Sequence, residues 1–433
     1  MAADVEPITR IAVPTHKIYA SAPAASRRHA AAMHLRPMPS TDHEYDPTLP
    51  ETFDSAHAVF ADLRARCPVA HSNSFEGFWA VTRYEDIHRI LMDPQTYITS
   101  VRNVVPGSST TGRRPPLHLD PPDHTPYRRA IDRAMGAARV ASIEPASRRI
   151  AAALMRDLVA RSEGDFVEHF SSPLPVYVFA EWMGLREEQV QVLWRTGQAY
   201  VKAWESFDRS RLAVAAEGLA TMAREVLEER RREPRDPLAD PTSSLLEARD
   251  NDGQPFPDVL LAGCLRQVLV VGLVAPPILL GSIAVHLARD QELQETLRSD
   301  LAIVPDAIEE FLRLYTPYRG FARSAKRPVE LHGRKIDPGE AIALVYASAN
   351  RDERVFPEPN AFKFRRENIR EHLAFGRGPH ICAGIPLARQ QLTIALEELL
   401  KQTRRFELCG EIRMSGMPEL GPIAVPLRLT PAS

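Results

Sequence analysis

The stretch that decides the fold is Phe375-Gly376-Arg377-Gly378-Pro379-His380-Ile381-Cys382-Ala383-Gly384. Its glycines and its proline predict a tight loop whose backbone is shaped in advance. Cys382 stands at the end of this loop, directly before a helix that we expect to begin near Ile385. A thiol in that position faces backbone N–H groups and the positive end of a helix, and both are expected to lower its pKa. Cys382 is therefore predicted to be a thiolate, which is either a soft metal ligand or a nucleophile.

Other functions of a glycine-rich loop fit these residues less well. A phosphate-binding loop follows a strand and matches G-x-G-x-x-G or the Walker pattern, and residues 375–384 do neither. A thiol protease needs a base that faces its cysteine, but His380 and Cys382 are two residues apart in a loop and no third group is evident. Free cysteines are most often inert and buried, and the crowded glycines argue against that interpretation here.

The pattern F-G-x-G-x-H-x-C-x-G resembles the haem-binding loop of the cytochrome P-450 family at every specified position. The resemblance implies that haem b is the cofactor and that Cys382 is the proximal thiolate ligand of its iron. It also implies that Phe375, Gly376 and Gly384 contact the cofactor, the glycines because they let the loop approach the porphyrin face. In such proteins the haem carries the oxidative chemistry, and the protein supplies ligand, proton path and pocket.

Four basic residues match positions that hold the two haem carboxylates in this family. Residues 120–129, DPPDHTPYRR, resemble the start of the helix that grips a haem propionate, which gives this role to His124 and Arg128. Arg323, within F-A-R, and His380 match two further propionate contacts. Two carboxylates need fixed cationic donors, and a guanidinium offers a fork of them. Taken alone, each of these residues is better explained as an exposed cation. Only the match of all four to the family positions favours a haem site.

An ion pair is predicted upstream of the cysteine loop. Glu310 and Arg313 form E-x-x-R, and residues at this spacing share one helix face. On a surface such a pair contributes only about 0–1 kcal/mol. In the cytochrome P-450 family the same motif joins a later arginine, and Asn350-Arg351-Asp352 resembles that later element. The resemblance therefore implies a buried network of Glu310, Arg313 and Arg351 under the haem.

The long apolar helix departs from the family pattern. Most members carry an acid followed by a threonine above the iron, and an ungapped alignment places Val274 and Ala275 at these positions. Neither side chain relays a proton, and together with Gly272 they mark the part of the helix assigned to catalysis. Four explanations stay open. They are ordered water held by carbonyls that Pro276 and Pro277 leave free, a substrate hydroxyl, peroxide as the oxidant, or a reaction other than monooxygenation.

The string Gly272-Leu273-Val274-Ala275-Pro276-Pro277 also resembles the haem domains of the self-sufficient, class VII members of the family. Those members carry an FMN reductase and a two-iron ferredoxin after the haem domain. The resemblance implies that electrons from NAD(P)H arrive through a flavin and iron–sulfur reductase. This reductase, or its ferredoxin, would be either a separate partner or fused C-terminally in a longer natural chain.

The remainder of the chain predicts mostly helix. Helical spacing is expected over 53–63, 84–92, 130–231, 258–288, 305–315 and 385–400, and strands over 78–82, 329–331, 341–347 and 423–429. Residues 101–122 and 232–258 are rich in turn formers and are expected to be connecting segments. The resemblance implies the cytochrome P-450 fold, mainly α with a small β region, with the haem between the long central helix and the cysteine loop.

Length alone favours about three domains at roughly 150 residues each. The resemblance spans residues 50–430 and implies instead a flexible N-terminal arm over 1–45 and a single haem-thiolate monooxygenase domain over 46–433.

Composition excludes several other classes of protein. Hydrophobic residues make up 44% and charged residues 25%, as in ordinary globular proteins, and a net charge of −2 indicates no nucleic-acid partner. Four widely spaced cysteines predict no disulfide framework and favour a reducing, cytoplasmic location. Residues 268–285 carry no charge over 18 residues, the lower limit for a membrane span. The glycines and prolines within them favour a buried core helix and no membrane.

The expected substrate is a hydrophobic small molecule, bound next to the long helix. Apolar and aromatic candidates to line its pocket, each also explained as ordinary core, are Val268, Val271, Leu273, Ala275, Tyr200, Trp204 and Phe207. An acidic electron carrier is expected to use a basic proximal face, for which a solvated arginine-rich surface is the equal alternative. The candidates for that face are Arg377, Arg113, Arg114, Arg404 and Arg405.

The sequence thus predicts a haem-thiolate monooxygenase that activates dioxygen with external electrons. Its reaction is expected to be the hydroxylation or O-dealkylation of a hydrophobic small molecule. A peroxide-driven oxygenase is the alternative within enzymes, and a non-catalytic haem sensor or carrier is the alternative from another class. The missing acid and threonine favour both alternatives slightly, whereas the lack of a signalling element in the sequence disfavours a sensor.

Overall fold

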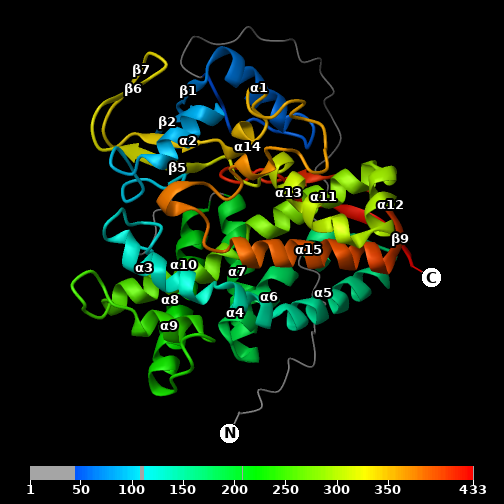
Figure 1. Ribbon diagram of the computed structural model, residues 1–433, viewed down its shortest axis with the longest axis horizontal. Coiled ribbons are helices and arrows are strands. Elements are labelled where there is room, and N and C mark those ends of the chain that lie inside the picture. Colours follow the sequence, from blue (N-terminus) through cyan, green and yellow to red (C-terminus); the bar gives the residue numbers. More distant parts are fainter. Residues whose placement is uncertain (1–43, 108–111, 207, 433) are drawn as a thin grey trace.

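Figure 1 shows a computed structural model of the chain, which describes residues 44–107, 112–206 and 208–432, with the backbone alone of Val271. The arm expected over 1–45 lies outside these residues except for its last two. One of the two, Tyr45, is buried and contacts the rings of Phe60 and Phe78. The described part of the chain therefore joins the packed core at its second residue, after the exposed Glu44.

The described residues are mainly helical. The helices are α1 Ala56–Arg66, α2 Tyr84–Met92, α3 His124–Ala134, α4 Ala137–Ser142, α5 Glu144–Val159, α6 Pro173–Met183, α7 Glu187–Glu205, α8 Arg209–Arg232, α9 Pro241–Glu247, α10 Asp258–Val271, α11 Ala275–Arg289, α12 Gln291–Ser299, α13 Val304–Leu314, α14 Tyr346–Ala349 and α15 Ile385–Gln402. Short turns of helix are η1 Ser74–Glu76, η2 Val167–Ser171, η3 Leu301–Ile303, η4 Ile369–Glu371 and η5 Gly378–His380. The strands are β1 Val69–Ser72, β2 Phe78–Val81, β3 Tyr97–Ile98, β4 Glu163–Asp165, β5 Phe321–Ala325, β6 Val329–Leu331, β7 Arg334–Ile336, β8 Ala341–Leu344, β9 Thr403–Leu408, β10 Arg413–Met414, β11 Pro422–Ala424 and β12 Pro426–Pro431. The expectation of a mainly α fold with a small β region is confirmed.

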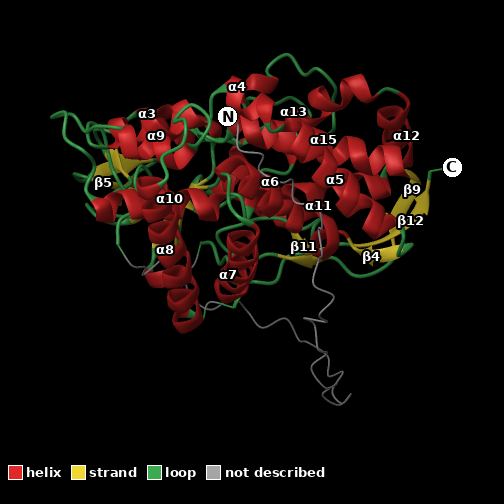
Figure 2. Cartoon of the chain, turned by 90° about the horizontal axis from the view of Figure 1, so that it is seen from below, coloured by secondary structure: helices red, strands yellow, loops and turns green. Residues whose placement is uncertain are grey.

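The strands form small sheets at two ends of the helical body (Figures 1 and 2). The largest has the order β1-β2-β8-β5-β3, and all its pairs are antiparallel except β2 with β8. A second sheet has the order β4-β12-β9 and lies at the far end of the molecule, next to the C-terminus. The large sheet contributes β5, and with it Arg323, to the centre of the protein.

Amphipathic spacing and polar caps explain why the helices form where they do. In α13, Val304, Ile308 and Phe311 recur at helical spacing and are fully buried. The carboxylate of Asp290 accepts a hydrogen bond from the backbone N–H of Leu293, which fixes the start of α12. α6 ends at Gly184, whose positive φ of 59° is the conformation that glycine adopts at low cost.

The long central helix is interrupted, whereas the sequence analysis expected one continuous helix over 258–288. α10 ends at Val271, residues 272–274 form a turn, and α11 begins at Ala275. Pro276 and Pro277 are the cause, because proline is well tolerated in the first turn of a helix and disrupts a helix interior. The two prolines therefore begin a second helix in place of bending a single one.

Residues 258–289, taken together, are the one stretch among the described residues that is long and apolar enough to cross a membrane. Within this stretch, 76% of the most apolar window is buried inside the protein. Such burial is what a core helix requires.

Most other expected elements are confirmed, with small changes. The segment 232–258 contains α9 in addition to connecting loop, and the strand expected over 423–429 is split into β11 and β12. The strand expected over 341–347 ends at Leu344, where the chain turns into α14.

The buried network around Glu310 has a different third member from the one expected. Arg313 donates to both carboxylate oxygens of Glu310, over 2.7 and 2.8 Å, and Arg366 donates to the same carboxylate over 3.0 Å. Arg351 was assigned to this place, but it donates to the carbonyl of Leu314 and lies over the ring of Tyr315. Arg351 caps the end of α13, and Arg366 is the residue that shares the buried negative charge.

Candidate functional site

The cysteine loop is held tightly between α2 and α15. It turns at Gly376 and Gly378, whose φ angles of 69° and 70° favour glycine. A Cβ at Gly378 would lie 2.2 Å from the carbonyl oxygen of Leu91 at the end of α2, so only glycine fits there. The backbone N–H of Cys382 donates to the carbonyl of Phe375 over 2.9 Å and closes the loop. α15 then begins at Ile385, as the sequence predicts.

The surroundings of Cys382 determine the pKa of its thiol. Its side chain is accessible, yet protein surrounds it, and this burial raises the pKa of the thiol. The N–H of Gly384 and the charge of Arg128 lower that pKa by less. The expectation of a lowered pKa is therefore wrong, because loss of hydration outweighs one N–H group and a helix end. A thiolate here needs a further positive charge, which a metal ion on Sγ supplies.

The four basic residues predicted for the haem carboxylates come together beside this loop. The rings of His124, at the start of α3, and His380 lie edge to face with their centroids 4.4 Å apart. Arg323 is buried in β5. The charges of Arg323, His124 and Arg128 all lower the pKa of His380, which shows that the four residues form one cluster.

Burial keeps both histidines of this cluster neutral near pH 7. The pKa of His124 is lowered to about 4 and that of His380 to about 2, chiefly by loss of hydration and in part by neighbouring cations. Nε2 of His124 is buried without a hydrogen-bond partner in the described part of the chain. The nearby carboxylate of Asp120 accepts from the N–H and the hydroxyl of Thr99 over 2.8 and 3.1 Å. The cluster therefore suits an added anion, and the two haem carboxylates fit it.

Arg128 also has a second role that the sequence did not predict. Its Nη1 donates to the backbone carbonyls of Pro379, over 3.2 Å, and Ile381. Its Nε donates to Asp132 over 2.8 Å. Arg128 thus ties α3 to the backbone of the cysteine loop and fixes the position of Cys382.

Gly272, Val274 and Ala275 all lie at the interruption between α10 and α11. Val274 lines the main cavity, and Ala275 is partly accessible. A Cβ at Gly272 would lie 3.3 Å from the ring of Phe179. The prolines that begin α11 have no N–H to donate to the carbonyls of residues 272 and 273. This segment therefore offers carbonyl acceptors to the site and no side chain that donates a proton.

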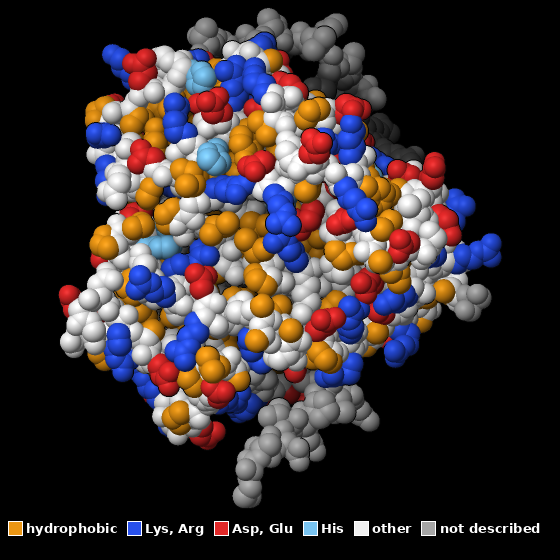
Figure 3. Space-filling model, in the orientation of Figure 1, with side chains coloured by type: hydrophobic (Ala, Val, Ile, Leu, Met, Phe, Trp, Pro, Cys, Tyr) orange, Lys and Arg blue, Asp and Glu red, His pale blue; other side chains and the backbone are white. Residues whose placement is uncertain are grey.

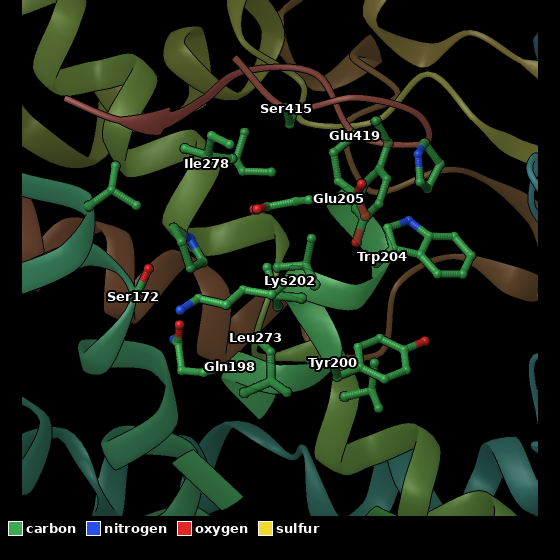
Figure 4. A pocket seen from close by; sticks show the side chains of 18 of the residues that line it. Ser172, Gln198, Tyr200, Lys202, Trp204, Glu205, Leu273, Ile278, Ser415 and Glu419 are labelled. Carbon is green, nitrogen blue, oxygen red and sulfur yellow. The ribbon is translucent and has the colours of Figure 1, made fainter. Parts of the chain in front are cut away.

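The main cavity has a volume of about 390 Å³ and lies between α7, the helix interruption and the C-terminal loops (Figure 4). Tyr200, Trp204 and Leu273 line it, as predicted. Val268 is buried in the core and Ala275 is not among the lining residues, so both of these assignments are wrong. The side chain of Val271 and all of Phe207 lie outside the described residues.

Sequence reasoning missed three chemically important residues of this cavity, Tyr318, Glu205 and Glu419. Burial raises the pKa of Tyr318, and the charges of Glu419 and Cys382 raise it as well, so this phenol lies near both groups. Glu205 directly follows Trp204, which was among the predicted lining residues, and this neighbourhood is only weak evidence for a place in the cavity. Tyr318 and Glu419 stand in irregular segments without periodicity, so the sequence contains no comparable signal for them.

The five arginines proposed for a basic docking face do not form one surface. Arg114 is buried and lines the cavity, and Arg113 lies at α10, where its carbonyl approaches Gly263. Arg404 and Arg405 belong to β9, at the opposite end of the molecule from α10 (Figure 1). Arg377 forms an ion pair with Glu371 over 3.1 Å. On the face that carries α15, basic and acidic side chains are interspersed (Figure 3).

Known proteins share both the sequence and the fold. The family model "Cytochrome P450" matches residues 281–414. "Cytochrome P450 109" of Bacillus spizizenii is 30% identical over 94% of this chain and 98% of the relative. "Linalool 8-monooxygenase" of Pseudomonas putida is also 30% identical, over 86% of this chain and 96% of the relative. The solved structure of cytochrome P450 CYP109Q5 from Chondromyces apiculatus is similar with a TM-score of 0.79 and 31% identity, over 90% of this chain and 99% of that one.

A mainly helical fold with a cysteine at the end of a glycine loop, beside a cationic cluster, is typical of a haem-thiolate protein. The chain belongs to the cytochrome P450 family, as its similarity to relatives over nearly their whole length shows. It is a monooxygenase that oxidises small molecules, with haem as its cofactor and electrons from an external reductase.

Proposed function

We propose that Cys382 binds the haem iron through its thiolate. The observation that carries this is an accessible thiol inside the protein, at the end of a closed glycine loop and beside the N–H of Gly384. Haem bound there supplies the activation of dioxygen, which electron density from a thiolate ligand favours. Phe375, Gly376 and Gly384 would contact the same face of the cofactor.

The cationic cluster orients the cofactor in this proposal. His124, His380 and Arg323 would donate to the two carboxylates, and the positive charge of Arg323 would favour these anions. Arg128 reaches the same region, and it holds the cysteine loop in place through the carbonyls of Pro379 and Ile381.

Protons reach the reaction site through water in this proposal. Val274 and Ala275 occupy the two relay positions of the helix, and neither side chain exchanges a proton. The carbonyls of Gly272 and Leu273 face two prolines that donate no hydrogen bond, so they are free to bind water at the interruption.

The substrate is a hydrophobic small molecule that is hydroxylated or O-dealkylated in the main cavity. The relatives support this class, since one is a linalool 8-monooxygenase and a similar solved structure is a complex with corticosterone. The apolar lining of Leu273, Val274 and Ile278 suits such a molecule.

In this proposal, residues 46–433 form a single domain, and the protein is cytoplasmic. A flavin and iron–sulfur reductase supplies its electrons. A reductase fused to a longer natural chain, as in class VII members, rests on the string at residues 272–277 alone. The relatives give no support for fusion, because this chain covers 98% of the one from Bacillus spizizenii.

The ligand assignment is tested with Cys382→Ser in the haem-loaded protein. We expect the substitution to abolish the thiolate-type absorption of the reduced carbon monoxide complex. Cys409→Ser, at an exposed cysteine, is the matched control and should leave this spectrum unchanged. A thiolate-type spectrum in the Cys382→Ser protein would contradict the assignment.

The source of oxygen is tested by product formation from a small aromatic ether. The ether is supplied once with NADPH and a surrogate reductase, and once with hydrogen peroxide alone. Product only with the reductase supports dioxygen activation with water as the proton carrier. An equal or higher yield with peroxide would mean that the chain works as a peroxygenase.

A further inference from the structure

Two carboxylic acids lie at one end of the main cavity. Glu205 is the last residue of α7, and Glu419 lies in the loop between β10 and β11. Figure 4 shows the two side chains close together, next to Trp204. Glu419 is buried, whereas Glu205 remains accessible to water at the edge of the cavity. An acidic pair at this place is unexpected, because the rest of the lining is mostly apolar or aromatic.

Neither carboxyl group of this pair has a cationic partner. Within the described residues, no ion pair reaches the side-chain oxygens of Glu205 or Glu419, and the carboxyl group of Glu419 accepts only from its own backbone N–H. Burial and, to a smaller extent, the charge of Glu205 raise the pKa of Glu419 to about 8. Burial also raises the pKa of Glu205. The folded protein therefore holds two acids without an ion-pair partner among the described residues, and Glu419 is mostly protonated near pH 7.

The nearby cations do not change this conclusion. Arg319, which forms an ion pair with Glu51, lowers the pKa of Glu419 by less than burial raises it. Lys202 and Arg413 act on Glu205, and the pKa of Glu205 remains raised in their presence. The other charged residues of the lining are Arg114, Arg161, Glu168 and Lys202.

Aromatic rings also line the cavity, and Trp204 lies beside the two acids (Figure 4). The rings of Tyr200 and Trp204 are stacked with their centroids 6.4 Å apart, and those of Tyr318 and Phe321 lie 4.5 Å apart. Tyr318 is also paired with Glu419 through an isolated β-bridge. A cation is attracted to the faces of such rings, and acids and aromatic faces together are the usual recognition site for an ammonium group.

We propose that the substrate is an apolar amine, whose protonated nitrogen binds between Glu205, Glu419 and the aromatic rings while its apolar part extends toward the helix interruption. This inference rests on the proposed function, because it names the substrate class of the same cavity. The bound cation stabilises the charged form of the acids, so its binding lowers their pKa and releases a proton from Glu419. Near pH 7 the release approaches about one proton per cation, since Glu419 is mostly protonated beforehand.

Binding to the haem-loaded protein is measured by calorimetry in two buffers with different ionisation enthalpies. The probes are trimethyl(3-phenylpropyl)ammonium, which cannot coordinate iron, and its neutral carbon isostere (4,4-dimethylpentyl)benzene. We expect the ammonium compound to bind at least about tenfold more tightly and to release a proton. The isostere should bind without proton release.

Glu419→Gln should abolish the proton release and reduce the preference for the ammonium compound by about tenfold, and Glu205→Gln should reduce that preference in the same direction. The isostere should bind equally to all variants. Glu411→Gln, which removes an exposed charge from the same C-terminal segment, is the matched control and should change nothing. Loss of the preference in Glu168→Gln, and not in the two variants of the pair, would place the cation elsewhere and overturn the inference.

The spectrum of the reduced carbon monoxide complex distinguishes a failure of the proposed haem site from a failure of the amine inference. If the unsubstituted protein lacks the thiolate-type spectrum, the proposed haem site is wrong, whatever the calorimetry shows. If that spectrum is present and the ammonium compound binds no better than the isostere, only the amine inference is wrong.

Discussion

The ring of His124 meets the ring of His380 at an angle of 61°, with the centroids 4.4 Å apart. This contact joins the first turn of α3 to the cysteine loop, and Arg323 reaches the same point from β5. Three elements that are distant in the sequence thus direct basic groups to one place, which gives the cofactor a fixed orientation relative to Cys382.

The neutral state of His124 makes the haem-free protein sensitive to acid. Its pKa is about 4 in the folded protein and about 6.5 in an unfolded chain, so only the unfolded chain takes up a proton between these values. The contribution to stability is complete above pH 6.5 and is lost as the pH falls towards 4. We expect His124→Gln to reduce the loss of unfolding free energy between pH 7 and 4.5 by roughly 2 kcal/mol.

Urea denaturation at a series of pH values measures this effect. His88→Gln, in the partly exposed face of α2, is the control and should keep the original pH dependence. An identical pH profile for His124→Gln and the unsubstituted protein would show that His124 is not held neutral.

Arg366 is expected to matter far more for stability than its neighbour Arg365. Arg366→Met leaves Glu310 buried with one of its two arginine partners removed, which should cost about 3–5 kcal/mol. Arg365→Met breaks only an exposed pair with Asp306, and should cost about 0–1 kcal/mol. Chemical denaturation of both variants tests the prediction, and equal losses would mean that Arg366 is not part of the network.

A side chain at Gly378 should destabilise the protein much more than a side chain at Gly339, which also has a positive φ. In Gly378→Ala the new methyl group meets the carbonyl of Leu91, so the cysteine loop must move, at a cost of about 3 kcal/mol or more. Gly339 has a φ of 88° but nothing within 4 Å of a Cβ, so Gly339→Ala should cost only about 1 kcal/mol. Thermal unfolding and haem content measure both effects. Full haem content and stability in Gly378→Ala would contradict the geometry of the loop.

Ala275→Thr places a hydroxyl group at the helix interruption, where the structure offers only carbonyls. We expect this hydroxyl to bind water and to change the fraction of electrons that ends in product by a factor of about two or more. The product formed and the hydrogen peroxide released per NADPH are the quantities to measure. Ala288→Thr, at the other end of α11, is the control. An unchanged ratio in Ala275→Thr would show that this position does not take part in proton delivery.

The parts of the site that depend on local sequence could be predicted. Gly376 and Gly378 force the backbone of the cysteine loop by their own conformations, so the position of Cys382 before α15 follows from ten consecutive residues. His124, Arg128 and Arg323 could be assigned because they match a family pattern, and the structure does bring them together.

The parts that depend on contacts between distant, irregular segments could not be predicted. Glu419 enters the cavity through a loop without periodicity, and its partner Glu205 lies at the end of α7. Arg366 reaches Glu310 from a loop in the same way and replaces the arginine expected there. The raised pKa of Cys382 could not be predicted for a related reason, because burial is a property of the whole fold and one local segment does not reveal it.

The interruption at residues 272–274 also divides the protein mechanically. α10 contacts α8 and α9, whereas α11 contacts α15 and the strands β9 and β11. Helical hydrogen bonds do not run unbroken across the turn, so a tilt of α10 is not passed on to α11 as the rotation of one rigid rod. The part of the protein around α10 and α8 can therefore adjust to the size of a bound substrate, while the part around α11 and α15 keeps its shape.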